Sequence, residues 1–215
     1  MYVPQHHQFT DPEALRALVQ AHPLGSWVCL TPDGLHAHHV PFFLDRTQGP
    51  WGTLKGHVAR ANGVWRHLQD GAPSVVMFQA AQAYVSPTWY PGKVAHGKVV
   101  PTWNYVAVHA HGTARAMDDP QWMLHMLDQL TQAQEAAMPT PWRVGDAPEA
   151  FIHRMLQGVV GVEISITRLE GKCKASQDEE LPDRLGTVKG LRNRPDDMAH
   201  AMARWVEQAL PVPKG

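Results

Sequence analysis

The sequence predicts an α+β fold dominated by β-strands, in which antiparallel strands form a β-barrel or a strongly curled sheet with peripheral helices. Six or seven strand-like segments joined by tight turns come before the first long helical segment. Several of these segments alternate apolar and polar residues, as half-buried strands do. The last third of the chain returns to helical segments.

The N-terminal part is expected to hold one helix and a hairpin. Thr10 or Asp11 provides a helix cap before Pro12, and the helix ends before Pro23 because the residue preceding a proline avoids the α region. Gly34 supplies the positive φ of the hairpin turn. The expected elements are a helix at 12–22, strands at 24–31, 35–44 and 51–57, and a short helix that carries Val64, Trp65 and Leu68.

The remaining chain continues with strands and ends in helices. Residues 74–79 are nearly all apolar, which indicates a buried strand. Further strands are expected from Ala83, at 103–117 and at 159–169, and helices at 121–134, 147–156, 178–191 and 195–210. Because no repeat or linker interrupts the chain, we expect residues 1–215 to form a single domain, with the helices from about residue 178 packed on it or extending from it.

Charge and cysteine content limit the classes of function. The formal net charge is −1, which provides no field for attracting nucleic acid, and the stretch from Arg184 to Arg194 is the only basic candidate for DNA contact. A solvated helix is the simpler interpretation of that stretch. Cys29 and Cys173 form no disulfide framework, so a reducing cytoplasmic location is expected. No apolar run approaches the ~18 residues of a membrane span.

The segment from Tyr84 to Tyr105 combines aromatic rings with prolines and short polar side chains. Pro87, Pro91 and Pro101 remove backbone donors and stiffen this loop. An apolar slot with a few polar groups is the usual composition of a cofactor site. The residues that we expect to face a planar ligand are Ser86, Trp89, Tyr90, Thr102, Trp103 and Asn104. The alternative is a loop that folds on its own aromatic rings or packs at a dimer contact.

Two short stretches are candidates for binding an anion. His57, Arg60 and Asn62 follow the end of a strand and precede a helix, where backbone N–H groups and a guanidinium can converge on a phosphate. Arg60 as a surface cation is the alternative. Lys172 and Lys174 share one face if the chain is extended, and could neutralise a phosphate dianion. The alternative for the lysines is a solvated edge strand.

The 14 histidines do not form a recognisable metal-binding motif. His36 and His38 fall at i and i+2 on a strand, as do His109 and His111, but no Cys or carboxylate lies at a short ligand spacing and no HExxH occurs. We therefore predict no metal site.

Six motifs in order resemble the PaiB family and cover most of the chain. They are Met1-Tyr-Val-Pro, Gly56-His-Val-Ala-Arg-Ala-Asn62, Ala83-Tyr-Val-Ser-Pro-Thr-Trp-Tyr90, Val100-Pro-Thr-Trp-Asn-Tyr105, Pro141-Trp142 and Gly171-Lys-Cys-Lys-Ala-Ser-Gln177. The resemblance implies a split β-barrel of the pyridoxamine-phosphate-oxidase type that binds FMN, in a homodimer with flavin sites at the subunit interface. The family is labelled a negative transcriptional regulator.

The resemblance and the residue types together predict FMN as the cofactor. Arg60 with Lys172 or Lys174 would meet its phosphate, because charge-assisted donors suit a dianion. The full set of predicted cofactor-binding residues is His57, Arg60, Asn62, Ser86, Trp89, Tyr90, Thr102, Trp103, Asn104, Lys172, Lys174 and Gln177. The chain departs from the family pattern where Asn62-Gly63 replaces Asn-Pro, and where Asp178-Glu179 replaces Asn-Arg and adds two acids.

Three functions follow from these observations. The first is an FMN-binding protein, either an FMN-dependent oxidoreductase or a flavin-linked regulator, although the sequence singles out no catalytic acid, base or nucleophile. The second is a DNA-binding negative regulator without catalysis, for which no helix-turn-helix or zinc module is found. The third is a haem-binding or haem-degrading protein, since related split barrels include such enzymes, with His57 or His96 as the ligand.

Overall fold

The computed structural model describes residues 1–211 and contains an eight-stranded, mostly antiparallel sheet with helices. The strands are β1 (Gln8–Phe9), β2 (Leu24–Thr31), β3 (Gly34–Pro41), β4 (Phe43–Asp45), β5 (Thr53–Ala59), β6 (Ala72–Val85), β7 (Thr102–Met117) and β8 (Val159–Lys174). Their order is β3-β2-β6-β7-β8-β5-β4, with β1 paired to β8. The predicted α+β class, dominated by strands, is confirmed.

The helices follow the predicted positions closely. The α-helices are α1 (Pro12–Ala21), α2 (Gly92–Ala95), α3 (Pro120–Glu135), α4 (Glu149–Leu156), α5 (Leu181–Arg192) and α6 (Asp197–Gln208). Short 3-10 helices are η1 (Gln5–His7), η2 (Gly63–His67), η3 (Pro87–Trp89) and η4 (Val144–Asp146). No helix in the described part of the chain is both long and apolar enough to cross a membrane.

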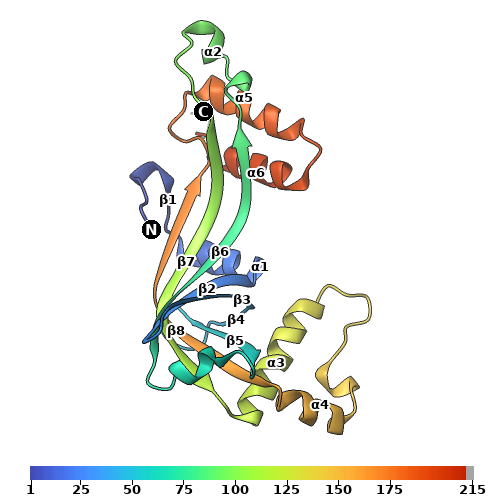
Figure 1. Ribbon diagram of the computed structural model, residues 1–215. Coiled ribbons are helices and arrows are strands. Elements are labelled where there is room, and N and C mark those ends of the chain that lie inside the picture. Colours follow the sequence, from blue (N-terminus) through green and yellow to red (C-terminus); the bar gives the residue numbers. More distant parts are fainter. Residues whose placement is uncertain (212–215) are drawn as a thin grey trace. The chain divides into compact units, whose positions relative to one another are not determined.

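The chain divides into two compact units (Figure 1). Unit 1 consists of residues 1–11, 79–108 and the chain from 170 onward, and unit 2 consists of residues 12–78 and 109–169. Strands β6, β7 and β8 each contribute residues to both units. The single domain expected from the sequence stays a prediction.

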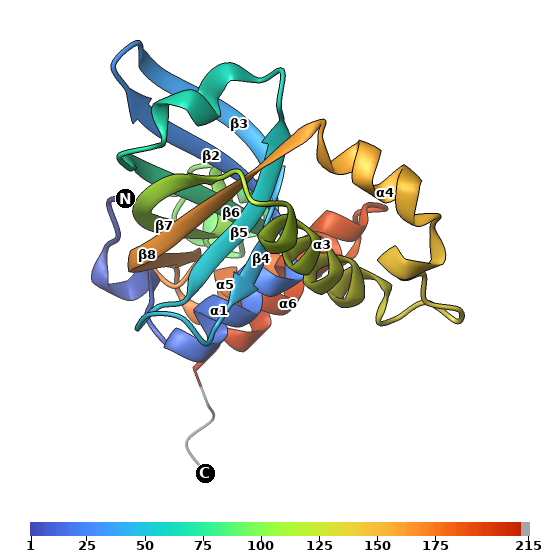
Figure 2. The same ribbon diagram turned by 90° about the horizontal axis from the view of Figure 1, so that it is seen from below.

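Unit 2 has a core of large apolar side chains beneath its strands. Strands β2 and β3 pair antiparallel from Leu24↔Pro41 to Thr31↔Gly34, and Trp27, Phe42 and Leu54 are fully or almost fully buried. A Cβ on Gly56 would lie 3.0 Å from a Phe42 ring carbon, so glycine allows the close approach of β5. Helix α3 packs beside β4 and β5 (Figure 2), where Met123 and Met126 are buried.

Unit 1 contains the helices α5 and α6, which pack against each other (Figure 1). Helix α5 also contacts η3 through Trp89, because Gly186 and Gly190 have no side chain. A Cβ added to Gly186 would lie 2.1 Å from the Trp89 carbonyl oxygen, and a Cβ added to Gly190 would lie 2.1 Å from the Trp89 ring. The Asp183 carboxylate of α5 accepts the Gly92 N–H at 2.9 Å. These contacts tie the predicted aromatic loop to the C-terminal helices.

Two strands are longer than the sequence predicted, and one helix is of a different type. The segments at 74–79 and from Ala83 are one strand, β6, and β8 continues to Lys174 because β1 pairs with Gly171 and Lys172. Such pairing is not local and leaves no periodic signal in the sequence. The expected helix after Arg60 is the 3-10 helix η2, whose five residues are too few for a developed helix dipole.

Candidate functional site

A buried polar cluster in unit 1 joins the start of β7 to the end of β8. Asn104 is fully buried and its Nδ2 donates to Ser176 Oγ at 2.8 Å, but within the described residues its Oδ1 has no hydrogen-bond partner. Ser176 has a φ of 59°, an unusual conformation for a residue other than glycine. A buried acceptor without a donor is costly, and it indicates a position where a ligand N–H or O–H can bind.

Lys172 is a buried cation in the same unit. Lys172 is only 9% exposed, and its Nζ donates to the Tyr2 carbonyl oxygen at 3.2 Å. The Nζ also lies 5.3 Å from the ring centroid of Tyr105. Within residues 1–211 it forms no ion pair with a carboxylate. Because a buried charge normally requires a counter-ion, Lys172 is a candidate anion ligand.

Lys174 and Thr102 lie beside this cluster. Lys174 is half-buried, and its Nζ donates to Thr102 Oγ1 at 2.5 Å. The hydroxyl keeps its own hydrogen for another acceptor. Of the predicted set, the structure therefore pairs Lys174 with Thr102, and it pairs Asn104 with Ser176 near the same ends of β7 and β8.

Gln177 shapes the turn that follows β8. Its Oε1 accepts the Ala175 N–H at 2.7 Å and lies 3.0 Å from His7 Nδ1, while its Nε2 donates to the Cys173 carbonyl oxygen at 2.7 Å. His7 is 3% exposed, and burial is the main cause that lowers its pKa. Gln177 thus acts through the backbone and His7, and its amide groups are already hydrogen-bonded.

The predicted aromatic surface is divided between two environments. Trp103 is 51% exposed, donates from Nε1 to Gln82 Oε1 at 3.0 Å and packs edge-on against Tyr84. Trp89, in η3, packs against the glycines of helix α5. Tyr90 is buried, and desolvation together with the nearby charge of Glu179 raises its pKa to about 12. Of the predicted rings, Trp103 thus presents the largest free surface to a planar ligand.

The Ser86 hydroxyl caps a short helix. It accepts the Thr88 N–H at 3.2 Å and lies 2.7 Å from the Thr88 hydroxyl. This is the usual N-cap arrangement, and it gives Ser86 a structural task in η3.

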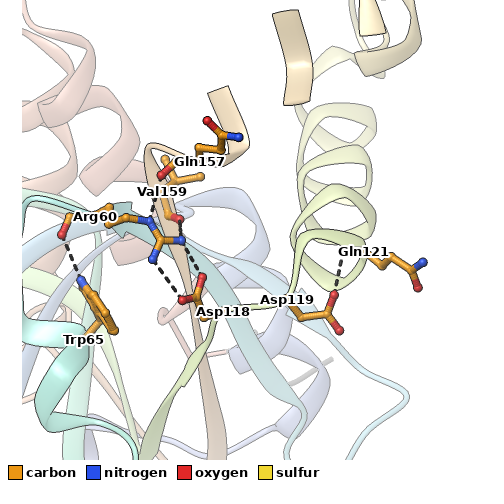
Figure 3. Close-up of polar contacts among 7 residues, drawn as sticks. All are labelled: Arg60, Trp65, Asp118, Asp119, Gln121, Gln157 and Val159. Carbon is orange, nitrogen blue, oxygen red and sulfur yellow. Dashed lines mark hydrogen bonds and ion pairs between the residues drawn. The ribbon is translucent and has the colours of Figure 1, made fainter. Parts of the chain in front are cut away.

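Arg60 belongs to unit 2, where it joins three segments (Figure 3). Its guanidinium donates to both carboxylate oxygens of Asp118, at 3.0 and 2.5 Å, and to the carbonyl oxygens of Gln157 and Val159, at 2.8 and 3.1 Å. Hydrogen bonding from Arg60 lowers the pKa of Asp118. Four of the five N–H groups of Arg60 are therefore in use.

A cavity of about 350 Å³ lies next to this ion pair. Its polar wall includes Arg60, Asp118 and Asp119, and Asp119 also caps helix α3 by accepting the Gln121 N–H at 2.8 Å (Figure 3). Its apolar wall consists of Met117, Met123, Leu156 and Val159. Two carboxylates in its lining disfavour a phosphate there.

His57 and Asn62 also lie in unit 2, where Asn62 is close to His38. Burial lowers the pKa of His57 and of His38, which favours the neutral form of both rings. Asn62 Nδ2 lies 3.3 Å from His38 Nδ1, and its Oδ1 accepts the Val64 N–H at 3.4 Å as the cap of η2. Buried His57 Nδ1 and His38 Nε2 have no hydrogen-bond partner within the described chain.

The sequence does not point to two residues of unit 1 that contact the predicted set. Ser176 lies in the motif at 171–177, but its partner Asn104 is 72 positions away. His7 contacts Gln177 across 170 positions. The only available signal was that the N-terminal motif and the motif at 171–177 occurred in the same chain.

The basic stretch considered for DNA contact is largely neutralised. Arg184 is buried and donates to the Ala209 carbonyl oxygen, Arg192 pairs with Glu207 at 2.5 Å, and Arg194 pairs with Asp196 at 2.8 Å. These contacts leave little free positive charge for DNA, and the buried Arg184 shows that the stretch is packed in part rather than fully solvated as the sequence suggested.

Comparison with protein families gives a match over most of the chain. A family model described as "Putative FMN-binding domain" matches residues 1–168. The match includes the predicted residues from His57 to Asn104 and ends before Lys172, Lys174 and Gln177.

Two curated relatives extend over nearly the full length. An uncharacterized protein of Emericella nidulans is 30% identical over 243 residues, covering 97% of this chain and 97% of the relative. The protease synthase and sporulation protein PAI 2 of Bacillus subtilis is 27% identical over 210 residues, covering 98% of each chain. The second match confirms the resemblance to the PaiB family.

A solved structure has the same fold. The FAD and haem binding protein from Mycobacterium smegmatis matches with a TM-score of 0.57 and 18% identity, covering 78% of this chain and 73% of the other. At this identity the likeness concerns the fold alone. The predicted split-barrel architecture is confirmed.

Proposed function

Because the chain belongs to the FMN-binding domain family, we propose that it binds FMN and that the buried polar cluster of unit 1 contributes to the site. The observation that carries this proposal is the buried ammonium of Lys172, which forms no ion pair within residues 1–211, in the same unit as Asn104 Oδ1, which has no hydrogen-bond partner within those residues. A phosphorylated ligand with N–H groups matches both, because it supplies an anion and a donor.

Five residues of unit 1 have a role in this proposal. Lys172 and Lys174 hold the phosphate, and the free hydrogen of the Thr102 hydroxyl donates to it. Asn104 accepts a hydrogen bond from the flavin ring. Trp103 provides apolar ring surface. When bound, FMN supplies electron or hydride transfer.

The proposal has an enzymatic form, in which the protein is an FMN-dependent oxidoreductase. It also has a regulatory form, in which the protein is a flavin-linked regulator. The described residues of the cluster include no carboxylate or thiol poised for proton transfer to a substrate. The protein then acts by binding and orienting the cofactor, and the flavin carries the chemistry.

Asn104 gives the most direct test of the site. We expect Asn104→Leu to weaken FMN binding about 10-fold, because one buried hydrogen bond of roughly 1.5 kcal/mol is lost. Flavin fluorescence titration measures the affinity, and a thermal melt shows that the variant is folded. Gln132→Leu serves as the control, since Gln132 is an exposed amide on α3 in unit 2. An affinity equal to that of the unaltered protein would remove Asn104 from the site.

The phosphate role predicted for Arg60 is the competing assignment, and Asp118→Asn tests it. If the lysines hold the phosphate, FMN affinity should stay within about two-fold, because the Arg60–Asp118 pair is structural and exposed. If Arg60 holds the phosphate, removing the competing carboxylate frees its N–H groups and tightens binding. The same fluorescence titration distinguishes the two results.

We also propose that the protein is a homodimer with the flavin at the subunit interface. Exposed apolar side chains of unit 1, Tyr84, Val100 and Trp103, support an interface there. Light scattering should give a molar mass of about twice 23.9 kDa. A monomer in the presence of saturating FMN would contradict this arrangement.

A further inference from the structure

Three potential metal ligands meet in unit 1, at a place that the flavin proposal does not use. One nitrogen of His6, one nitrogen of His7 and one carboxylate oxygen of Asp178 all lie within 4.8 Å of one another. The histidines come from η1, and Asp178 follows the turn after β8. No periodic pattern in the sequence connects these residues, because about 170 positions separate them.

The hydrogen bonds of Gln177 fix the tautomer of His7. The Gln177 Nε2 donates to the Cys173 carbonyl oxygen and the Gln177 Oε1 accepts the Ala175 N–H, so the orientation of the Gln177 amide is determined. The Oε1 is therefore an acceptor toward His7 Nδ1, which must carry the hydrogen. In a neutral ring, His7 Nε2 then keeps its lone pair free for a metal ion.

This arrangement is the usual support of a metal-binding histidine. Such a histidine donates its other ring N–H to an oxygen, which fixes the orientation of the ring. His7 is only 3% exposed, so its ring is also held by packing. Gln177 supplies the oxygen, and its own position is held by two backbone contacts.

We propose that His6, His7 and Asp178 form a site for a divalent transition metal ion, with Zn²⁺ as the preferred occupant. Two imidazoles and one carboxylate are a ligand set that zinc accepts, and a fourth position remains for water. Calcium and magnesium prefer oxygen ligands and are disfavoured here.

The geometry requires only a small movement of exposed side chains. Tetrahedral zinc with bonds of about 2.0–2.1 Å separates its ligands by roughly 3.4 Å. His6 and Asp178 are exposed, so both can rotate toward the buried His7. His7 provides the fixed ligand and the other two close around the ion.

The charges around the site partly oppose one another. The positive charge of Lys172 acts on His7 and reduces the affinity of the site for a cation. The negative charge of Asp178 also acts on His7 and increases that affinity. Glu179 is also close to Asp178 and adds negative charge. We therefore expect a site of moderate affinity that forms by local rearrangement.

Calorimetric titration of the full-length, flavin-free protein with ZnCl₂ tests the site. We expect zinc to bind at this site, and the double variant His6→Ala/Asp178→Asn to lose at least 10-fold in affinity there, since two of three ligands are removed. Cobalt(II) should give the visible absorption of a tetrahedral ion in the unaltered protein and not in the double variant. Both substitutions are at exposed positions, so folding is preserved.

The remaining histidines require a matched control. His22→Ala removes an exposed histidine just after α1 and should leave the zinc binding and the cobalt spectrum unchanged. Equal zinc affinity in the unaltered protein and the double variant would overturn the proposal. Because no flavin is present, the result is independent of whether the protein binds FMN.

Discussion

Replacing Lys172 and Lys174 together with methionine should weaken FMN binding on the order of 100-fold or more. Each charge-assisted hydrogen bond contributes roughly 1.5–3 kcal/mol, and 1.4 kcal/mol corresponds to about 10-fold in affinity. Lys172 is nearly buried and has no ion-pair partner within residues 1–211, so methionine fills its volume without stranding a carboxylate. The effect should therefore fall on the ligand rather than on the fold.

Riboflavin separates the phosphate from the ring in this experiment. It has the same tricyclic ring but no phosphate, so the double variant should bind riboflavin about as well as the unaltered protein does. Lys189→Met, which removes one exposed lysine on α5, is the control and should not change either affinity. An equal loss for FMN and riboflavin would show that the lysines do not recognise the phosphate.

Lys55→Met should lower the free energy of unfolding by about 3–5 kcal/mol, because it breaks a buried ion pair. Lys55 Nζ lies 2.7 Å from Asp45 Oδ2, and the two residues are 4% and 7% exposed. The variant leaves the Asp45 charge buried without its main partner. Urea denaturation followed by circular dichroism measures the change.

The partner substitution and the pH dependence check the same ion pair. Asp45→Asn/Lys55→Met removes both charges and should recover part of the loss. Burial acts to raise the pKa of Asp45, but hydrogen bonds from Lys55 and Thr47 outweigh it and lower the pKa to about 2. Since the folded pKa is below the ordinary 3.8, this stability is present above pH 3.8 and is lost as the pH falls toward 2. A pH-independent difference between unaltered and variant protein would contradict this assignment.

Local signals in the sequence were sufficient for most of the fold. Strand β2 has the predicted bounds, Leu24–Thr31, because alternation and the flanking proline and turn residues all lie within a few positions. Helix α1 ends as predicted, before Pro23. The end of β8 was not predictable in the same way, since its last residues pair with β1 at the other end of the chain.

The partners of the predicted site residues could not be read from the sequence. Arg60 was selected as a phosphate ligand for its charge and its place before a helix, but its partner Asp118 is 58 positions away. Trp89 was selected as free ring surface, and the glycines that receive it are in α5. Residue type indicates which groups can bind a ligand, and only the tertiary contacts decide which of them remain free to do so.

The binding of FMN to the unaltered protein is the most direct test of the central claim. Equilibrium dialysis of the purified protein against FMN, with the absorbance spectrum recorded on the protein side, should give one flavin per chain and a shifted flavin spectrum. A parallel titration with haem should give no saturable Soret change. Absence of bound flavin at saturating FMN, or one equivalent of haem in its place, would contradict the account.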